Sequence, residues 1–531
     1  MIRYVRFRAV RARVSARASA VRQPGGAEVS DHVGILRTKS IEQSIADTDE
    51  PEYQLKRNLT ALDLTVFGVG VIIGAGIFTL TGRAAATVSG PAIVLSFVVS
   101  AICCGLAALC YAEFASTVPV SGSAYTFSYA TLGEMIAWII GWDLLLELLL
   151  GASVVAQGWS TYAVVLLDNF GITWPEALGP GGSVDLLSML LILVLTILTT
   201  IGIKESMRVN LVLVAVKLFV VLFVIIAGIG FINPANYTPF IPEAQPGGAA
   251  VEHWYQQPLI QAMFGLEPTA FGIGGIFTGA ALVFFAYIGF DVVATTAEEA
   301  KNPKRDLPIG IIGSLVICTI LYGAVALVIT GMVKYDQIDP KAALAKAFTN
   351  LGHPGYATLI SAGAVAGLTT VVLTLMIGGA RVVFAMSRDH LLPPPLSKVH
   401  PRFQTPYVIT IAIGIFAMLV AGLTPIGRLE EMVNIGTLTA FVLVSIGVVV
   451  LRRTRPDLPR AFKVPFSPVL PILSALICFY LTLNLSIETW LRFVIWMALG
   501  FGIYFAYGYK KSRLGTGETL AQMAHHERRQ Q

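Results

Sequence analysis

The stretch of sequence that decides the fold reads Gly68-Val69-Gly70-Val71-Ile72-Ile73-Gly74-Ala75-Gly76-Ile77-Phe78. Glycine at this density disfavours an uninterrupted helix. Non-helical backbone at membrane depth is tolerated only where it is buried in protein or lines a cavity. A break here would present amide N–H groups, at the positive end of the following half-helix, to a carboxylate. The alternative interpretation is close helix packing by small residues.

A second stretch of this kind lies further along the chain and reads Phe284-Phe285-Ala286-Tyr287-Ile288-Gly289-Phe290-Asp291. An acidic residue inside a membrane span costs about 2.5 to 3.5 kcal/mol on insertion scales. Asp291, beside a glycine in an apolar run, therefore calls for a functional reason. Two interrupted helices in corresponding positions of two halves point to the substrate site of an inverted-repeat transporter.

The composition places the whole chain in a membrane. The 531 residues are 55% hydrophobic and 13% charged, against about 25% charged in soluble proteins, and the mean hydropathy of +0.73 excludes an ordinary soluble globule. Because a spanning helix needs about 20 apolar residues, we predict an all-α integral membrane protein with twelve transmembrane helices. The predicted spans are 62–82, 91–116, 135–167, 184–203, 209–232, 273–297, 308–332, 356–387, 407–424, 432–451, 467–486 and 491–509.

The positive charges predict the orientation. We divide the chain into a basic amino-terminal tail (1–58), a membrane domain (59–510) and a carboxy-terminal tail (511–531). Of the 37 Lys and Arg residues, 29 fall in the tails and alternate loops, six in the opposite loops, and two, Lys217 and Arg381, inside spans. Positive residues favour the cytoplasm. We therefore expect a multi-pass protein of the cell membrane with both termini cytoplasmic, and no nucleic-acid partner.

The sequence offers no pattern typical of an enzyme or a metalloprotein. The five cysteines lie inside apolar runs without a CxxC pair, and the seven histidines fall in tails or loops. Neither set has metal-ligand spacing, and no nucleophile-base pair is visible. We expect no enzymatic activity, no cofactor and no metal.

Several motifs together resemble a known family. Gly-Ala-Gly-Ile-Phe at 74–78, Tyr-Ala-Glu-Phe-Ala at 111–115 and Glu-Glu-Ala-Lys-Asn-Pro at 298–303 are similar to the amino acid-polyamine-organocation superfamily. The 295–303 stretch and Phe-Ala-Met-Ser-Arg-Asp at 384–389 most resemble its cationic amino acid transporter branch, which includes bacterial permeases. The resemblance runs from about Arg37 to the twelfth span. It is far more specific for the family than for the substrate.

The resemblance implies a fold and a site. The fold would be LeuT-like, with inverted repeats at about 59–232 and 273–451, broken first and sixth helices, and two added helices at about 467–509. The carboxylate of an L-amino acid would meet backbone amides around Ala75 and Gly76. Its ammonium would meet the carbonyls of four residues, and one of these would also supply the aromatic ring that closes over the substrate. The four are Ile72, Phe285, Ala286 and Ile288, and the ring is that of Phe285.

Two ionisable residues are candidates for proton coupling. Lys217 lies about two turns inside the fifth span, too deep for easy snorkelling to the surface. Sodium-independent relatives carry a lysine at this place, where sodium-coupled relatives of the same fold hold an ion. The alternative is a structural lysine bonded to a carbonyl of the broken helix. Asp291 is a possible second proton carrier, with a helix-capping or salt-bridging role as its alternative.

Three further residues bear on selectivity. Glu147, which shares a helix face with Asp143, resembles the acidic residue that points toward the side-chain pocket in this branch. Leu375 and Met376 occupy the stretch that sets side-chain preference, and cationic members have a small polar residue in place of Leu375. We therefore predict proton-coupled, sodium-independent uptake of small or neutral amino acids. Transport of arginine or lysine, and a non-transporting amino-acid receptor, are the alternatives.

Overall fold

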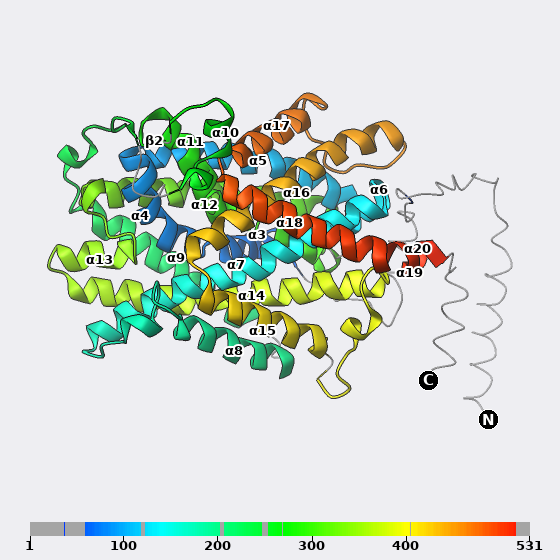
Figure 1. Cartoon of the computed structure of the whole chain (residues 1–531), viewed down its shortest axis with the longest axis horizontal. Coiled ribbons are helices and arrows are strands. Elements are labelled where there is room, and N and C mark those ends of the chain that lie inside the picture. Colours follow the sequence, from blue (N-terminus) through cyan, green and yellow to red (C-terminus); the bar gives the residue numbers. More distant parts are fainter. Residues whose placement is uncertain are drawn as a thin grey trace.

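The computed structural model describes residues 37, 59–117, 123–201, 207–246, 253–267, 269–403 and 405–516. These residues form one bundle of long helices that run side by side (Figure 1). Most of the two predicted tails, and residues 118–122, lie outside the described residues.

In the first half, long helices alternate with short helical segments. The label η denotes a 3-10 or π-helix. They are α3 (Ala61–Ile72), η1 (Gly76–Leu80), α4 (Thr81–Ala84), η2 (Ala85–Ser89), η3 (Gly90–Ala92), α5 (Ile93–Thr117), α6 (Ser123–Thr131), α7 (Glu134–Asn169), η4 (Glu176–Leu178), α8 (Leu186–Ile201) and α9 (Met207–Ile229). A connecting segment follows with η5 (Pro234–Tyr237), β1 (Gln245–Pro246), η6 (Trp254–Gln256), α10 (Leu259–Met263) and β2 (Thr269–Ala270).

The second half repeats this alternation. Its elements are α11 (Gly272–Val283), η7 (Phe284–Tyr287), η8 (Asp291–Glu299), α12 (Pro303–Met332), η9 (Tyr335–Gln337), α13 (Ala343–Asn350), α14 (Pro354–Arg388), η10 (Pro394–Ser397), α15 (Tyr407–Leu423), α16 (Ile426–Thr454), α17 (Val469–Leu483), α18 (Ile487–Ile503), η11 (Tyr504–Gly508), α19 (Tyr509–Lys511) and α20 (Arg513–Thr516). Strands β1 and β2 pair antiparallel, with Gln245 opposite Ala270.

The helices confirm an all-helical membrane protein. Eight helical segments in the described chain are long and apolar enough to cross a membrane, and four further apolar helices, α3, α8, α15 and α17, are shorter. Each of the twelve predicted segments coincides with a helix or with a pair of half-helices. The two long segments are single helices, α7 with 36 residues and α14 with 35. At a rise of about 1.5 Å per residue, each exceeds the roughly 30 Å of a hydrocarbon core.

Both predicted interruptions are present. Helix α3 begins with a capping box between Thr60 and Asp63 and ends at Ile72, because Ile73 has an extended backbone (φ −70°, ψ 93°). Helical structure resumes at Gly76. In the sixth span, Ile288 is extended (ψ 136°) and Gly289 has φ +116°, a conformation that favours glycine.

Different elements lie at the two ends of the bundle. Figure 1 shows α4, α13 and β2 at one end, which we call the outer end following the predicted topology, and α19 and α20 at the other. At this inner end, Arg37 forms a bidentate pair with the buried carboxylate of Glu134 at 2.7 and 3.0 Å. The same carboxylate accepts hydrogen bonds from Tyr129 and Tyr504. Arg37 thus ties the tail to the first turn of α7.

Candidate functional site

The two helix breaks meet at the centre of the bundle. A Cβ atom added to Gly76 would lie 2.2 Å from the Cα of Ala286, so the two backbones are in direct contact. A Cβ atom added to Gly289 would lie 2.7 Å from Cγ1 of Val71. Ala75, Phe285 and Ala286 are buried and Ile288 is partly buried. The structure therefore brings the sequence-predicted residues of both spans together.

The end of α3 is held by side chains from other helices. The last carbonyls of a helix have no partner within it, and here the Ile73 amide satisfies only the carbonyl of Val69, at 3.0 Å. Lys217 Nζ donates to the carbonyl of Gly70 at 2.7 Å. The Tyr322 hydroxyl donates to the carbonyl of Ile72, also at 2.7 Å. The carbonyl predicted to meet a ligand ammonium thus already accepts one hydrogen bond.

Lys217 lies deep in the protein. Its side chain is 1% exposed, and a Cβ atom on Gly367 of α14 would lie 2.8 Å from its Cγ. The lysine therefore joins α9 to both α3 and α14. A cation is also favoured at the negative, carboxy-terminal end of a half-helix. The ammonium of Lys217 therefore contacts the last turn of α3 directly.

The break in the sixth span is held by its own backbone. The Ile288 amide donates to the carbonyl of Phe285 at 3.2 Å, and the Val292 amide donates to the carbonyl of Gly289 at 3.2 Å. Asp291 is 2% exposed, and its Oδ1 has no hydrogen-bond partner in the described part of the chain. The hydrogen bond from the Ile288 amide already occupies one lone pair of the Phe285 carbonyl oxygen.

The three residues predicted to line a side-chain pocket lie on α7 and α14. Leu375 and Met376 are buried on α14, and a Cβ atom on Gly151 of α7 would lie 3.5 Å from Cδ1 of Leu375. Glu147 is 1% exposed and lies near Thr437 of α16 and near Asp291. Within the described residues, Glu147 Oε1 and both carboxyl oxygens of Asp143 lack hydrogen-bond partners. Buried polar atoms are normally hydrogen-bonded, so these carboxyl oxygens are available to bind a proton or to accept a hydrogen bond from a ligand.

Two contributors were missed from the sequence. Tyr322 of α12 caps the end of α3, as described above. Asn434 of α16 is fully buried and donates from Nδ2 to the carbonyl of Ala281 at 2.8 Å, three residues before η7, while its Oδ1 has no partner among the described residues. Tyr322 lies in a long apolar segment, and Asn434 lies three residues after Glu431, so each was visible as a polar residue in a span, but the sequence does not name its partner.

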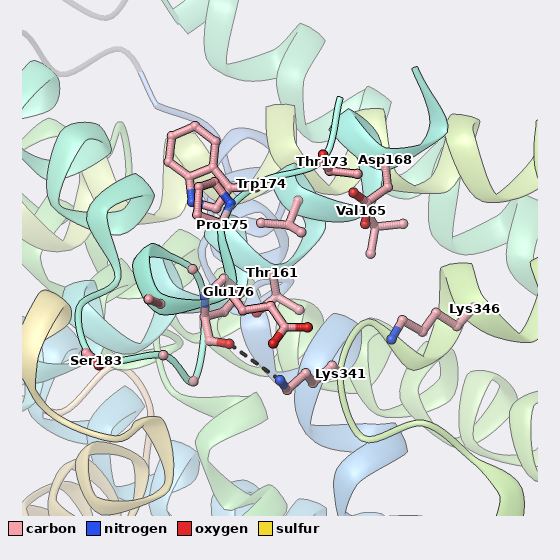
Figure 2. Close-up of a pocket in the computed structure, with 16 residues that line it drawn as sticks. Thr161, Val165, Asp168, Thr173, Trp174, Pro175, Glu176, Ser183, Lys341 and Lys346 are labelled. Atoms are coloured by element: carbon pink, nitrogen blue, oxygen red, sulfur yellow. Dashed lines mark hydrogen bonds between the residues drawn. The ribbon is translucent and has the colours of Figure 1, made fainter. Parts of the chain in front are cut away.

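A large cavity opens at the outer end of the bundle. Its volume is about 1010 Å³, and it is lined by the outer end of α7, the loop that follows it, Lys341 before α13 and Lys346 of α13 (Figure 2). None of the residues predicted from the sequence lines it. No motif or periodicity predicted this cavity, because its walls combine the end of α7 and the following loop with residues 341–346, which are far away along the chain.

Comparison with known proteins defines the class. The profile of the amino acid permease family matches residues 59–504. The chain therefore belongs to this family of membrane transporters, and the predicted resemblance is confirmed. Together with the apolar helices, the family makes this a multi-pass membrane permease rather than an enzyme.

Individual relatives include bacterial and plant transporters. The chain is 48% identical to the branched-chain amino acid permease BcaP of Bacillus subtilis, covering 90% of this chain and 99% of the relative. It is 44% identical to the methylthioribose transporter of the same organism, with the same coverage. It is 38% identical to the vacuolar cationic amino acid transporter 4 of Arabidopsis thaliana, covering 80% of this chain and 68% of the relative.

Proposed function

We propose that this permease is a proton-coupled, sodium-independent importer of neutral amino acids, with branched-chain amino acids as the first candidates. It works by alternating access in a twelve-helix, LeuT-like fold with two five-helix inverted repeats. It sits in the cell membrane with both termini in the cytoplasm. The observation that carries the proposal is the buried hydrogen bond from Lys217 to the Gly70 carbonyl, at the end of the broken first span.

The two breaks suit the charged groups shared by all amino acids. Amides at the start of η1, around Ala75 and Gly76, face a carboxylate with the favourable end of a helix dipole. Carbonyls of Ile72, Phe285, Ala286 and Ile288 are the acceptors for the ammonium. Such a site recognises only the common backbone of its substrates, so selectivity comes from elsewhere.

The side-chain pocket favours apolar substrates. Leu375 and Met376 give a guanidinium or an ammonium no hydrogen-bond partner, and an unpaired buried charge costs several kcal/mol. A branched aliphatic side chain pays no such penalty. The name of the BcaP relative, which is 48% identical to this chain, agrees with this preference.

Coupling follows from the position of Lys217. When protonated, the ammonium bonds the Gly70 carbonyl and stabilises the carboxy-terminal end of α3 through its dipole. When the proton leaves toward the cytoplasm, that charge interaction is lost and α3 is free to move. One proton then enters with each substrate, and no sodium ion is needed.

Uptake into proteoliposomes tests the proposal. Leucine should accumulate without sodium when the outside is acidic, and accumulation should stop when a protonophore dissipates the gradient. A panel of the twenty amino acids as competitors should inhibit most strongly with leucine, isoleucine and valine. Strong competition by arginine would favour the cationic alternative, and specific binding without counterflow of label would favour a receptor.

A second candidate substrate is methylthioribose, because a relative 44% identical to this chain carries it in its name. This sugar has no ammonium or carboxylate, so it would leave the groups at both breaks without charged partners. Methylthioribose should therefore fail to compete with leucine. Competition at equal concentration would shift the proposal to that substrate.

Labelling tests the orientation. The five native cysteines are all buried, so a cysteine introduced at the exposed Trp254 can be labelled selectively. An impermeant maleimide should react with Trp254→Cys in intact cells. Labelling only after the cells are broken would reverse the topology.

A further inference from the structure

The volume of the outer cavity is that of a small-molecule binding site. Its volume of about 1010 Å³ is at the upper end of the roughly 300 to 1,000 Å³ typical of small-molecule sites. In Figure 2, Glu176 and Lys341 project into the opening between the two loops, and Lys346 approaches it from the other side. The indole of Trp174, with its N–H bonded to the Leu178 carbonyl at 3.0 Å, forms part of the wall.

The cavity lies close to the central site along α7. Thr161 lines the cavity, and Gly158 is one helical turn further inward. A Cβ atom on Gly158 would lie 3.0 Å from Thr79 Oγ1 and 3.3 Å from the Cβ of Ala75. One turn of a single helix therefore separates the cavity wall from the residue expected to meet the substrate carboxylate.

The charges in the cavity are mixed and largely uncommitted. Among the described residues, Asp168 and Glu176 form no ion pair. Lys341 Nζ makes a long hydrogen bond to the Pro180 carbonyl at 3.5 Å. Lys346, by contrast, is paired with Asp339, which lies outside the lining. Two carboxylates and one ammonium thus face the same space.

We propose that this cavity is an outer binding site for the zwitterion of a free amino acid, distinct from the site at the helix breaks. The ligand ammonium lies against Asp168 and Glu176, and its carboxylate lies against Lys341. Occupancy raises the local concentration of substrate one helical turn from the central site. The inference rests on the proposed function, because it takes the transported amino acid as its ligand.

The charged contacts in the outer cavity affect how readily the protein captures substrate from solution. Both carboxylates and Lys341 are exposed, so each charged contact is weak. Weak outer binding speeds entry into the central site and leaves the later conformational step unchanged. Loss of the outer site should therefore raise KM and leave the maximal rate unaltered.

The decisive variant is the double substitution Glu176→Gln with Lys341→Met, which preserves the net charge of the cavity. Its matched control is Lys334→Met with Asp336→Asn, an exposed ion pair (3.2 Å) just before the same loop and outside the lining. In proteoliposomes, the KM for labelled leucine should rise about fivefold in the cavity variant, with an unchanged maximal rate. The control should match the unmodified protein. An unchanged KM in the cavity variant would overturn the outer site while leaving the transport proposal intact.

Binding stoichiometry gives a second, independent readout. Equilibrium dialysis of the purified, unmodified protein with labelled leucine should reveal two sites per chain, one tighter than the other, and the cavity variant should keep only the tighter one. A single site in the unmodified protein would refute the outer site. Unmodified protein that neither binds nor transports any amino acid would instead refute the proposed function itself.

Discussion

The breaks in the first and sixth spans look alike in sequence but are stabilised differently. The end of α3 depends on hydrogen bonds from two other helices, donated by Lys217 of α9 and Tyr322 of α12. The sixth-span break closes its own hydrogen bonds, from Ile288 to Phe285 and from Val292 to Gly289. The first break is therefore closed by side chains of other helices, whereas the second is closed mainly by hydrogen bonds within its own segment, and Asn434 of α16 supports the carbonyl of Ala281 before it.

This difference assigns separate roles to the two breaks. A break held from outside can change when its neighbours move or when one of them loses a proton. A break held by local hydrogen bonds and by a glycine at φ +116° keeps its shape. We infer that the first span carries the moving part of the site and that the sixth span provides a fixed surface for the substrate.

The largest expected effect comes from adding one methyl group where the breaks touch. In Gly76→Ala, the new Cβ would lie 2.2 Å from the Cα of Ala286, so the two backbones must separate. Leucine affinity should fall at least about 100-fold, or roughly 2.7 kcal/mol. The matched control is Gly74→Ala, whose Cβ makes only an ordinary contact with Val371 at 3.5 Å. Its affinity, measured by equilibrium dialysis, should change less than about threefold.

Folding must be separated from binding in this pair. Size-exclusion chromatography and thermal unfolding in detergent should show both variants as folded, with the alanine at 76 somewhat less stable. Equal loss of affinity in the two variants would mean that the contact between the breaks does not shape the site.

The next effect distinguishes the two side chains that cap α3. Lys217→Met removes the titratable partner of the Gly70 carbonyl, so uptake should lose its dependence on external pH and leucine should no longer accumulate. Tyr322→Phe removes a neutral hydrogen bond, worth about 1 kcal/mol. That variant should keep its pH dependence and lose activity about fivefold. Uptake measured between pH 5 and pH 8 separates the two.

A different result would change the role of the lysine. If Lys217→Met still concentrates leucine on a proton gradient, the lysine is a structural brace. Other residues would then carry the protons. The rate of leucine exchange without a proton gradient would show how much the Lys217 hydrogen bond contributes to the conformational change.

A smaller effect is expected at the self-supported break. Asp291→Asn keeps the size and shape of the side chain and an oxygen that can still accept from the backbone amides of Gly289 and Val292, and the other hydrogen bonds that close this break join backbone atoms. Uptake should fall less than about threefold and should still increase as the external pH falls. A flat pH profile in Asp291→Asn, with normal expression and leucine binding, would make Asp291 a proton carrier and would remove the proposed division between the two breaks.

The sequence predicted the breaks better than the contacts that hold them. Glycine density at 68–76 and the pair Gly289 and Asp291 located both interruptions, because backbone preference and the cost of a buried charge are local properties. The partner of Lys217 was anticipated only as a carbonyl of the broken helix. Tyr322 was missed because a hydroxyl in an apolar helix has no target until the helices are packed.

The outer cavity shows the same limit more strongly. Its charges come from the end of α7 with the loop after it and from α13 with the residues before it, about 160 residues apart, as the Lys341 bond to Pro180 illustrates. No periodicity or motif links these positions. Long apolar helices were predictable from hydropathy, whereas the meeting of these segments depends on tertiary packing.

The smallest expected effect concerns selectivity for the substrate side chain, which we assign to α14 and not to either break. If the breaks recognise only the shared backbone of amino acids, a change on α14 should alter which side chain is accepted without weakening the backbone contacts. Leu375→Ser supplies a hydroxyl and space beside Gly151 of α7. Lysine and arginine should then compete with leucine about threefold better than before, while leucine uptake falls by no more than about threefold. Leu373→Ser, two residues away and partly exposed, is the control, and its competition profile should not change. Robust arginine uptake by the unmodified protein would contradict the prediction, because Glu147 would then already compensate for the apolar Leu375.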